Sequence, residues 1–115
     1  MPDHKPAIAQ AERRLHHRHS VQVPIRLQPD DVLTTIAAET ANLSLYGCSV
    51  MLTDQLPVGL RLRLELSIAD QPAFICGRVI TRHPQFGTGI MFLKFDDDAE
   101  DRLRNFLERL QSLGA

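Results

Sequence analysis

The chain has 115 residues, which is the size of one globular domain. Thirteen Lys and Arg residues against fourteen Asp and Glu residues leave a net charge of −1, and this balance disfavours proteins that bind long nucleic acids or membrane surfaces. No apolar stretch approaches the ~20 residues that cross a bilayer, and the first residues lack the apolar region of a signal peptide. We therefore expect a single-domain cytoplasmic protein that does not enter the membrane.

Alternating apolar and polar residues predict short strands over most of the chain. In the first strand, residues 21–27, Val, Ile and Leu occupy alternate positions, and Pro24 suggests a sheet edge or a bulge. The alternation is strictest in residues 60–68, where every second residue is Leu or Ile. The other strands are predicted at residues 33–43, 47–52, 73–82 and 88–95, with turns at residues 28–31, 56–59, 70–72 and 84–87. Six short strands joined by turns predict an all-β domain, either a barrel or a sandwich.

After the last strand, the spacing of apolar residues changes to that of an amphipathic helix. The apolar stripe consists of Leu103, Phe106, Leu107, Leu110 and Leu113. Acidic residues in the range 96–101 precede or begin this helix, and Gly114 is expected just past its end. We predict that the acidic run caps the helix, since the glycine and the distal glutamate of a calcium-binding loop are absent.

The residue types that perform catalysis or bind metals form no recognisable site in the sequence. Cys48 and Cys76 lack the spacing of a metal or redox motif and are predicted to be reduced core residues. His16, His17 and His19 lie on one short segment and would need ligands from elsewhere to hold an ion. No serine lies in a nucleophile-elbow pattern. We therefore predict neither an enzyme nor a metal site.

The basic residues are unevenly distributed and include the first of two spaced motifs. Residues 1–26 contain five basic and two acidic residues, a net charge of +3, and eleven of the thirteen basic residues in the chain are arginine. Arg14 and Arg18 form an Arg-x-x-x-Arg pattern just before the first predicted strand. An Asn-x-Ser-x-x-Gly pattern follows in the turn between the second and third predicted strands, formed by Asn42, Ser44 and Gly47.

Each motif alone has a plainer interpretation, because Arg14 and Arg18 could be ordinary surface charges and the second motif an ordinary β-turn. In this order and context, the pair resembles the motifs of the PilZ domain family, whose members bind the bacterial messenger cyclic di-GMP. The resemblance extends from about residue 12 to residue 113. It implies a six-stranded antiparallel Greek-key β-barrel with a C-terminal α-helix, formed by residues 12–115, and a flexible segment at residues 1–11.

The resemblance also implies roles for the arginines. A guanidinium can bind a phosphate or the O6/N7 edge of guanine through paired hydrogen bonds, and it can stack on a base. Arg14 and Arg18 would close over the ligand. Arg13 lies directly before them, and in this family such an arrangement is associated with a stacked pair of ligands, so we predict two per chain.

The second motif supplies polar groups of a different kind. Asn42 would offer its amide to a guanine edge, Ser44 its hydroxyl to a phosphate or base, and Gly47 a turn with open backbone access. Tyr46 would either line the pocket or pack at a strand edge. His16 and His17 are expected to be solvent-facing spacers between the arginines.

We therefore predict a cyclic di-GMP receptor without catalytic activity or cofactor, which relays the signal to a downstream protein that the sequence does not identify. An enzyme-accessory or purely structural module also fits the sequence, and two more specific alternatives remain open. One is an adaptor of the same family that binds no ligand. The other is a small β-barrel that binds single-stranded nucleic acid through Arg13, Arg14 and Arg18, although that function favours aromatic stacking residues and the chain has five Phe, one Tyr and no Trp.

Overall fold

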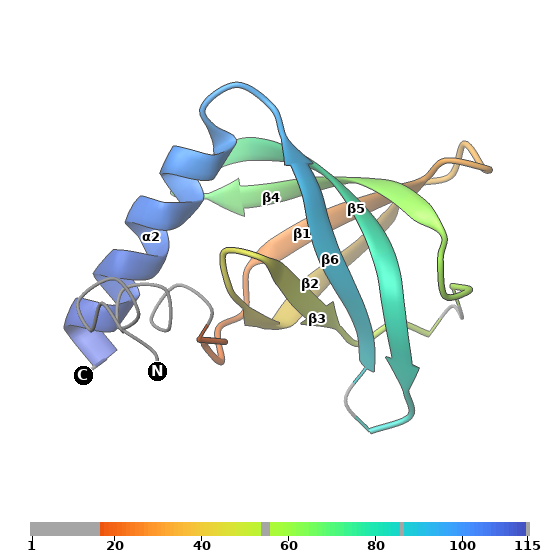
Figure 1. Ribbon diagram of the computed structural model, residues 1–115, viewed down its shortest axis with the longest axis horizontal. Coiled ribbons are helices and arrows are strands. Elements are labelled where there is room, and N and C mark those ends of the chain that lie inside the picture. The colour runs from red at the N-terminus through yellow and green to blue at the C-terminus, as the bar shows by residue number, and fades with distance from the viewer. Residues whose placement is uncertain (1–16, 54–55, 86, 115) are drawn as a thin grey trace, which may run out of the picture.

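The computed structural model describes residues 17–53, 56–85 and 87–114 and shows six antiparallel strands in a closed barrel, followed by a helix (Figure 1). The elements are β1 (Pro24–Pro29), β2 (Ile36–Leu43), β3 (Gly47–Val50), β4 (Arg61–Ile68), β5 (Gln71–His83), β6 (Gly87–Phe95) and α2 (Ala99–Gly114). Around the barrel the order is β1-β2-β3-β6-β5-β4. Because β4 returns to lie beside β1, strands β1 to β4 form a Greek key. The predicted fold is confirmed.

The first two strands begin later than predicted. Pro24 is the first residue of β1, where a missing N–H is tolerated, and a closed barrel has no edge for it to occupy. The prediction of an edge or a bulge at Pro24 was therefore wrong. Strand β2 begins at Ile36 instead of residue 33, and Leu33 is 98% exposed in the preceding loop. The Thr35 hydroxyl donates to the side-chain oxygen of Gln28 at 2.8 Å, which ties this loop to β1.

The β4–β5 hairpin is tighter than its sequence suggested. Ala69 and Asp70 both have positive φ, of 53° and 63°, as the two central residues of a type I′ hairpin turn require. The predicted turn at residues 70–72 is therefore shifted, and Pro72 lies in β5 opposite Ser67. This turn fixes the register that points the alternating leucines of β4 into the barrel.

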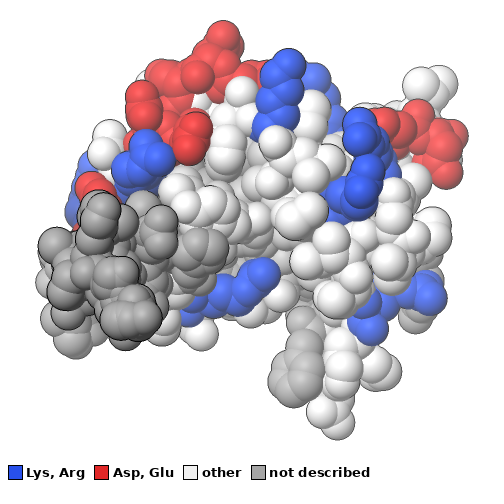
Figure 2. Space-filling view, viewed as in Figure 1, with Lys and Arg blue, Asp and Glu red and all other residues white. Residues whose placement is uncertain are grey.

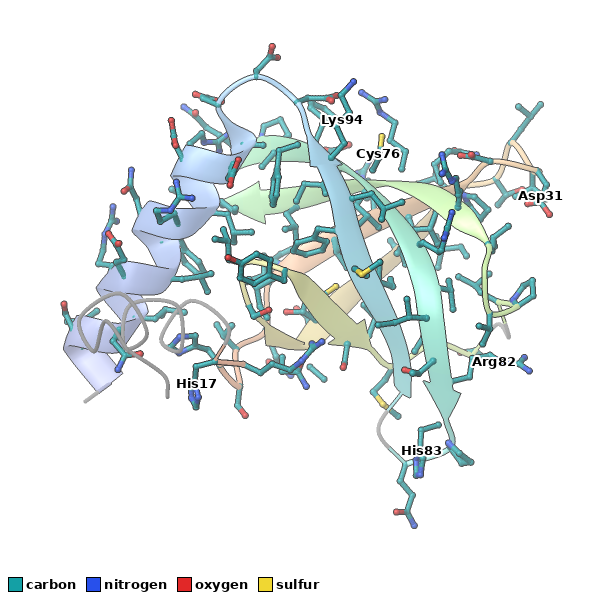
Figure 3. The ribbon with its side chains drawn as sticks, in the orientation of Figure 1. His17, Asp31, Cys76, Arg82, His83 and Lys94 are labelled. Carbon is teal, nitrogen blue, oxygen red and sulfur yellow. The ribbon has the colours of Figure 1, made fainter. Side chains whose placement is uncertain are left out.

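The barrel interior is filled by apolar side chains from alternate strand positions. The largest fully buried side chains are Ile25, Leu27, Leu43, Val50, Leu62, Leu64, Leu66, Ile75 and Ile90 of the strands, Leu45 of the β2–β3 turn, and Leu103 and Leu107 of α2. Cys48 is also buried, as predicted, whereas Cys76 is half-buried on the outer surface of β5 beside Lys94 (Figure 3). The prediction that Cys76 is a core residue was wrong, because its position in the alternation of β5 points it outward.

Helix α2 lies across one end of the barrel, beside the β4–β5 hairpin (Figure 1). Leu103 and Leu107 are buried against the barrel, but Leu113 at the end of the predicted stripe is 80% exposed. The Arg102 guanidinium donates to three backbone carbonyls at the hairpin: those of Ile68 at 3.0 Å, Gln71 at 2.9 Å and Pro72 at 2.7 Å. Within the described residues, no helix is long and apolar enough to span a bilayer.

We predict that Arg102→Lys lowers the free energy of unfolding by about 1–2 kcal/mol, because an ammonium cannot reproduce the planar fork that reaches three carbonyls. The matched control is Arg104→Lys, whose arginine makes exposed ion pairs with Glu100 and Asp101. That change is expected to cost less than about 0.5 kcal/mol. Urea unfolding of both variants measures the difference, and equal midpoints would contradict the assigned role of Arg102.

Candidate functional site

Arg18 and Asn42, one residue from each sequence motif, meet at the end of β2. The Nη1 atom of Arg18 donates a hydrogen bond to Oδ1 of Asn42 at 2.8 Å across 24 residues of chain. The residues that follow these two, His19 and Leu43, hold the arrangement in place, because their backbones exchange hydrogen bonds of 2.9 and 3.0 Å. The segment before β1 is thus paired with the end of β2, and the Arg18 guanidinium is positioned over the start of the second motif.

The second motif forms the β2–β3 turn, and Ser44 closes it. The Ser44 N–H donates to the Gly47 carbonyl at 2.9 Å, and its hydroxyl donates to the same carbonyl at 3.3 Å. That hydroxyl also accepts from the Tyr46 N–H at 3.1 Å, and Ser44 is only 3% exposed. The structure therefore gives Ser44 a turn-closing role, in agreement with the plainer interpretation of this motif as a β-turn. The signal for it was present, since serine hydroxyls commonly bond backbone groups in turns.

Gly47 is needed because β3 approaches β6 closely at this point. A Cβ atom built on Gly47 would lie 2.4 Å from the carbonyl oxygen of Ile90, a distance that real Cβ atoms do not adopt. Gly47 is not among the residues with positive φ, so the requirement is for space and not for a special backbone conformation. The motif glycine thereby fixes the distance between the turn and the outer face of β6.

Tyr46 lies at the tip of this turn with 44% of its surface exposed. Its carbonyl accepts a hydrogen bond from the Phe92 N–H at 2.9 Å, which attaches the turn to β6. The exposure places Tyr46 on the outer surface next to the motif residues, as the pocket-lining alternative requires, and excludes a core position.

Burial disfavours the charged forms of two ionisable groups near Arg18, Cys48 and His19. Burial raises the pKa of the Cys48 thiol to about 12, and the nearby Arg18 charge opposes this shift only weakly. Cys48 is therefore an inert thiol. Partial burial lowers the pKa of His19, and repulsion from His17 lowers it further. The rings of these two histidines pack edge to face with centroids 5.0 Å apart, and Nε2 of His19 is buried without a hydrogen-bond partner.

Acidification is expected to loosen the segment that carries Arg18. The folded protein disfavours protonation of His19. The stability that depends on the neutral imidazole is therefore fully present above its ordinary pKa of 6.5 and is lost as the pH falls below that value. Thermal unfolding at about pH 7.5 and about pH 5.5 should show a larger loss of stability for the wild type than for His19→Gln, which cannot titrate. Equal losses in the two proteins would contradict this expectation, because the carboxylates that also titrate are common to both.

Four of the six predicted site residues are brought together by the structure: Arg18, Asn42, Ser44 and Gly47. Arg13 and Arg14 lie outside the described residues, as does His16. His17 lies on the segment before β1 (Figure 3) and is exposed. Within the described part of the chain, no three His, Cys, Asp or Glu residues are grouped so that they could hold a metal ion.

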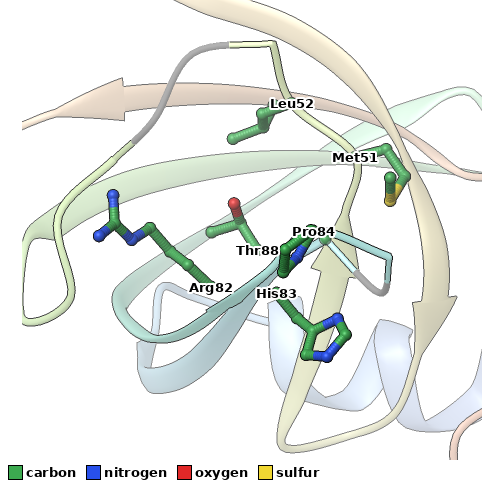
Figure 4. A pocket seen from close by; sticks show the side chains of 7 residues that line it. Met51, Leu52, Arg82, His83, Pro84 and Thr88 are labelled. Carbon is green, nitrogen blue, oxygen red and sulfur yellow. The ribbon is translucent and has the colours of Figure 1, made fainter.

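A separate pocket lies at the β5–β6 hairpin, away from the motif turn (Figure 4). Its volume is about 330 Å³, and its walls include Met51, Arg82, His83 and Thr88. None of its lining residues belongs to either motif. Nδ1 of His83 accepts from the Gln85 N–H at 3.0 Å, so this imidazole helps to shape the hairpin loop.

Comparison with known proteins identifies related domains. The family model of the PilZ domain matches residues 12–109. Among solved structures, the fold is similar to the PilZ domain of CeSA from a cellulose-synthesizing bacterium, with a TM-score of 0.62 and 18% identity over 83% of this chain and 98% of that one. It is also similar to the PilZ domain of Escherichia coli YcgR in a structure with c-di-GMP, with a TM-score of 0.59 and 16% identity over 85% and 91% of the two chains.

A third similar structure is the Bacillus subtilis inhibitor of motility MotI/DgrA, with a TM-score of 0.59 and 19% identity over 83% of this chain. The match spans half of the Bacillus chain. A comparison with curated protein sequences found no match. At these identities, the structural likeness concerns the fold.

Proposed function

Because the chain belongs to the PilZ domain family, we propose that it is a receptor for cyclic di-GMP, which it binds where the two motifs meet at the β2–β3 turn. The observation that carries the proposal is the 2.8 Å hydrogen bond between Arg18 and Asn42, since it places one residue of each motif at a single point. The related PilZ domain of YcgR, in a structure with c-di-GMP, supports the choice of ligand. The proposed receptor domain is residues 12–115.

The chemistry of the paired side chains suits a dinucleotide that carries two phosphates and two guanines. The bond to Asn42 engages one of the five N–H donors of the Arg18 guanidinium, so the other donors remain for a phosphate or a guanine edge. The Asn42 amide nitrogen can donate to a guanine acceptor while its oxygen holds Arg18. Arg13 and Arg14 complete the proposed cation set, and Arg13 is the residue that we associate with a second bound ligand.

The Ser44 hydroxyl acts in this proposal mainly through the turn. It is engaged with two backbone groups and is almost fully buried, so it holds the Tyr46–Gly47 backbone in a fixed position beneath the ligand. In the proposed complex the arginines contact the ligand over this rigid turn, and a downstream protein would recognise the surface so formed. The domain thus acts as an adaptor and performs no reaction.

The decisive experiment is a calorimetric titration of the full chain with cyclic di-GMP, GTP and a single-stranded oligonucleotide. We expect the chain to bind two molecules of cyclic di-GMP and to bind neither GTP nor the oligonucleotide. The Arg14→Ala variant should lose the binding of cyclic di-GMP. No detectable binding at tens of micromolar ligand would overturn the proposal. Tighter binding of the oligonucleotide, lost in the same variant, would instead identify an electrostatic site for nucleic acid.

A further inference from the structure

Two β-bulges lie on the outer face of β5 and β6, close to the motif turn. Cys76 of β5 pairs with Lys94 of β6, and the next residue, Gly77, pairs with Phe92, so Leu93 is an extra residue on β6. Between Val79 and Thr81, β5 has the extra residue, which is Ile80. Bulges of this kind redirect side chains and are common next to binding sites. Here they present two apolar side chains to solvent, each 40% exposed.

Three residue pairs lie between the two bulges, and the middle pair is Arg78 and Met91. Met91 is 38% exposed and is paired on its other side with Gly47 of the motif turn. Gly47, Met91 and Arg78 therefore occupy one row across β3, β6 and β5, and with strands ~4.8 Å apart, Arg78 starts roughly 10 Å from the motif glycine. Met91 lies in this row, and three more exposed apolar residues lie one or two positions from it along the chain: Tyr46, Ile80 and Leu93. We call these four side chains the wall platform.

Arg78 has an unusual environment for an arginine. Its Nε atom is buried without a hydrogen-bond partner, and it makes no ion pair with any described carboxylate. On the neighbouring strand β4, its cross-strand partner is Arg61. Two like charges therefore lie directly opposite each other, an arrangement that destabilises a sheet. Of the Arg78 nitrogens only Nε is buried and unpartnered, so the Nη groups lie at the surface, where they can donate to a ligand. The face seen in Figure 2 shows a broad uncharged area, bordered by Lys and Arg side chains at the top and right and by Asp and Glu side chains at the upper left.

We infer that the wall platform and Arg78 bind a guanine base of the second cyclic di-GMP molecule, an inference that rests on the proposed function. A purine offers a flat polarizable face to the apolar side chains and an acceptor edge, O6 and N7, to the guanidinium. An aliphatic or acidic protein segment would use only one of these two features. The first ligand then binds at the Arg18–Asn42 turn, and the second extends along the row from Gly47 to Arg78.

The test is a calorimetric titration of the full chain and its Arg78→Ala variant with cyclic di-GMP. We expect two ligands for the wild type and one for the variant, with the tighter site retained and the second weakened about tenfold or more. Arg78→Lys should not restore the second site, because an ammonium lacks the planar fork. The matched control is Arg26→Ala, which removes one charge from the outer surface of β1 opposite Glu65 and should leave both sites intact.

Each outcome separates the inference from the proposed function. A wild type that binds no cyclic di-GMP overturns the proposed function and this inference with it. A wild type that binds the ligand, with an Arg78→Ala titration identical to its own, overturns only the inference. Sedimentation velocity on the same samples tests whether Arg78 instead serves self-association. If Arg78→Ala loses a dimer while its ligand binding is unchanged, this face is a contact between copies of the chain and the inference is overturned. A Leu93→Ser variant, which leaves every charge in place, should weaken the second site as well.

Discussion

Replacing Gly47 with alanine is expected to lower the free energy of unfolding by about 3 kcal/mol, at the upper end of the usual cost of overpacking. The added Cβ would lie 2.4 Å from the Ile90 carbonyl oxygen on the neighbouring strand β6, which cannot move away without disturbing its pairing with β5. The turn between β2 and β3 would move with β3. We therefore expect the same variant to bind cyclic di-GMP less tightly even under conditions where it is fully folded.

Gly59→Ala is the matched control for this experiment. Gly59 has a φ of +96°, which disfavours alanine, but a Cβ added there meets no atom within 4 Å. Its cost should be about 1 kcal/mol, from backbone strain alone. Urea unfolding of the two variants compares a steric conflict with a conformational one. An equal or larger loss for Gly59→Ala would show that the close approach of β3 to β6 is not what Gly47 provides.

The architecture was predictable because local patterns and long-range packing agree in most of this chain. The alternation in residues 60–68 became β4, with each of its predicted inward residues from Leu62 to Ile68 buried. Strand ends were less predictable, since they depend on contacts that alternation does not encode. The loop before β2 is tied to β1 by Thr35 and Gln28, and the β4–β5 turn uses left-handed conformations at Ala69 and Asp70, residues that carry little sequence signal for them.

The site was predictable only in part, because a motif names residues without stating their partners. The spacing of Arg18 and Asn42 indicated a shared site, but it could not show that the two side chains hydrogen-bond each other. Ser44 and Gly47 were assigned to the ligand from the resemblance, whereas the structure first explains them by turn closure and strand packing. The row from Gly47 to Arg78 depends on the register of three strands and two bulges, which no linear spacing reveals.

Removal of the Arg18 guanidinium should have a large effect on ligand binding. We expect Arg18→Ala to weaken cyclic di-GMP about a hundredfold or more, because the change removes a charge-assisted contact to the ligand and also the bond that orients Asn42. The free energy of unfolding should fall by less than about 1 kcal/mol, since the Arg18–Asn42 bond is exposed. A large loss of affinity with little loss of stability is the pattern that distinguishes a binding residue from a structural one.

A series at the same two positions tests why arginine is needed. Arg18→Lys keeps the charge but loses the planar fork, so we expect an affinity between those of Arg18→Ala and the wild type. Asn42→Asp gives the second motif a carboxylate, which can accept charge-assisted bonds from guanine N–H groups and from Arg18, and it should bind cyclic di-GMP more tightly than the wild type. Raised salt should reduce the affinity of the lysine variant more steeply, because an ammonium relies on charge alone. Equal affinities for Arg18→Lys and the wild type at every salt concentration would show that Arg18 contributes only its charge.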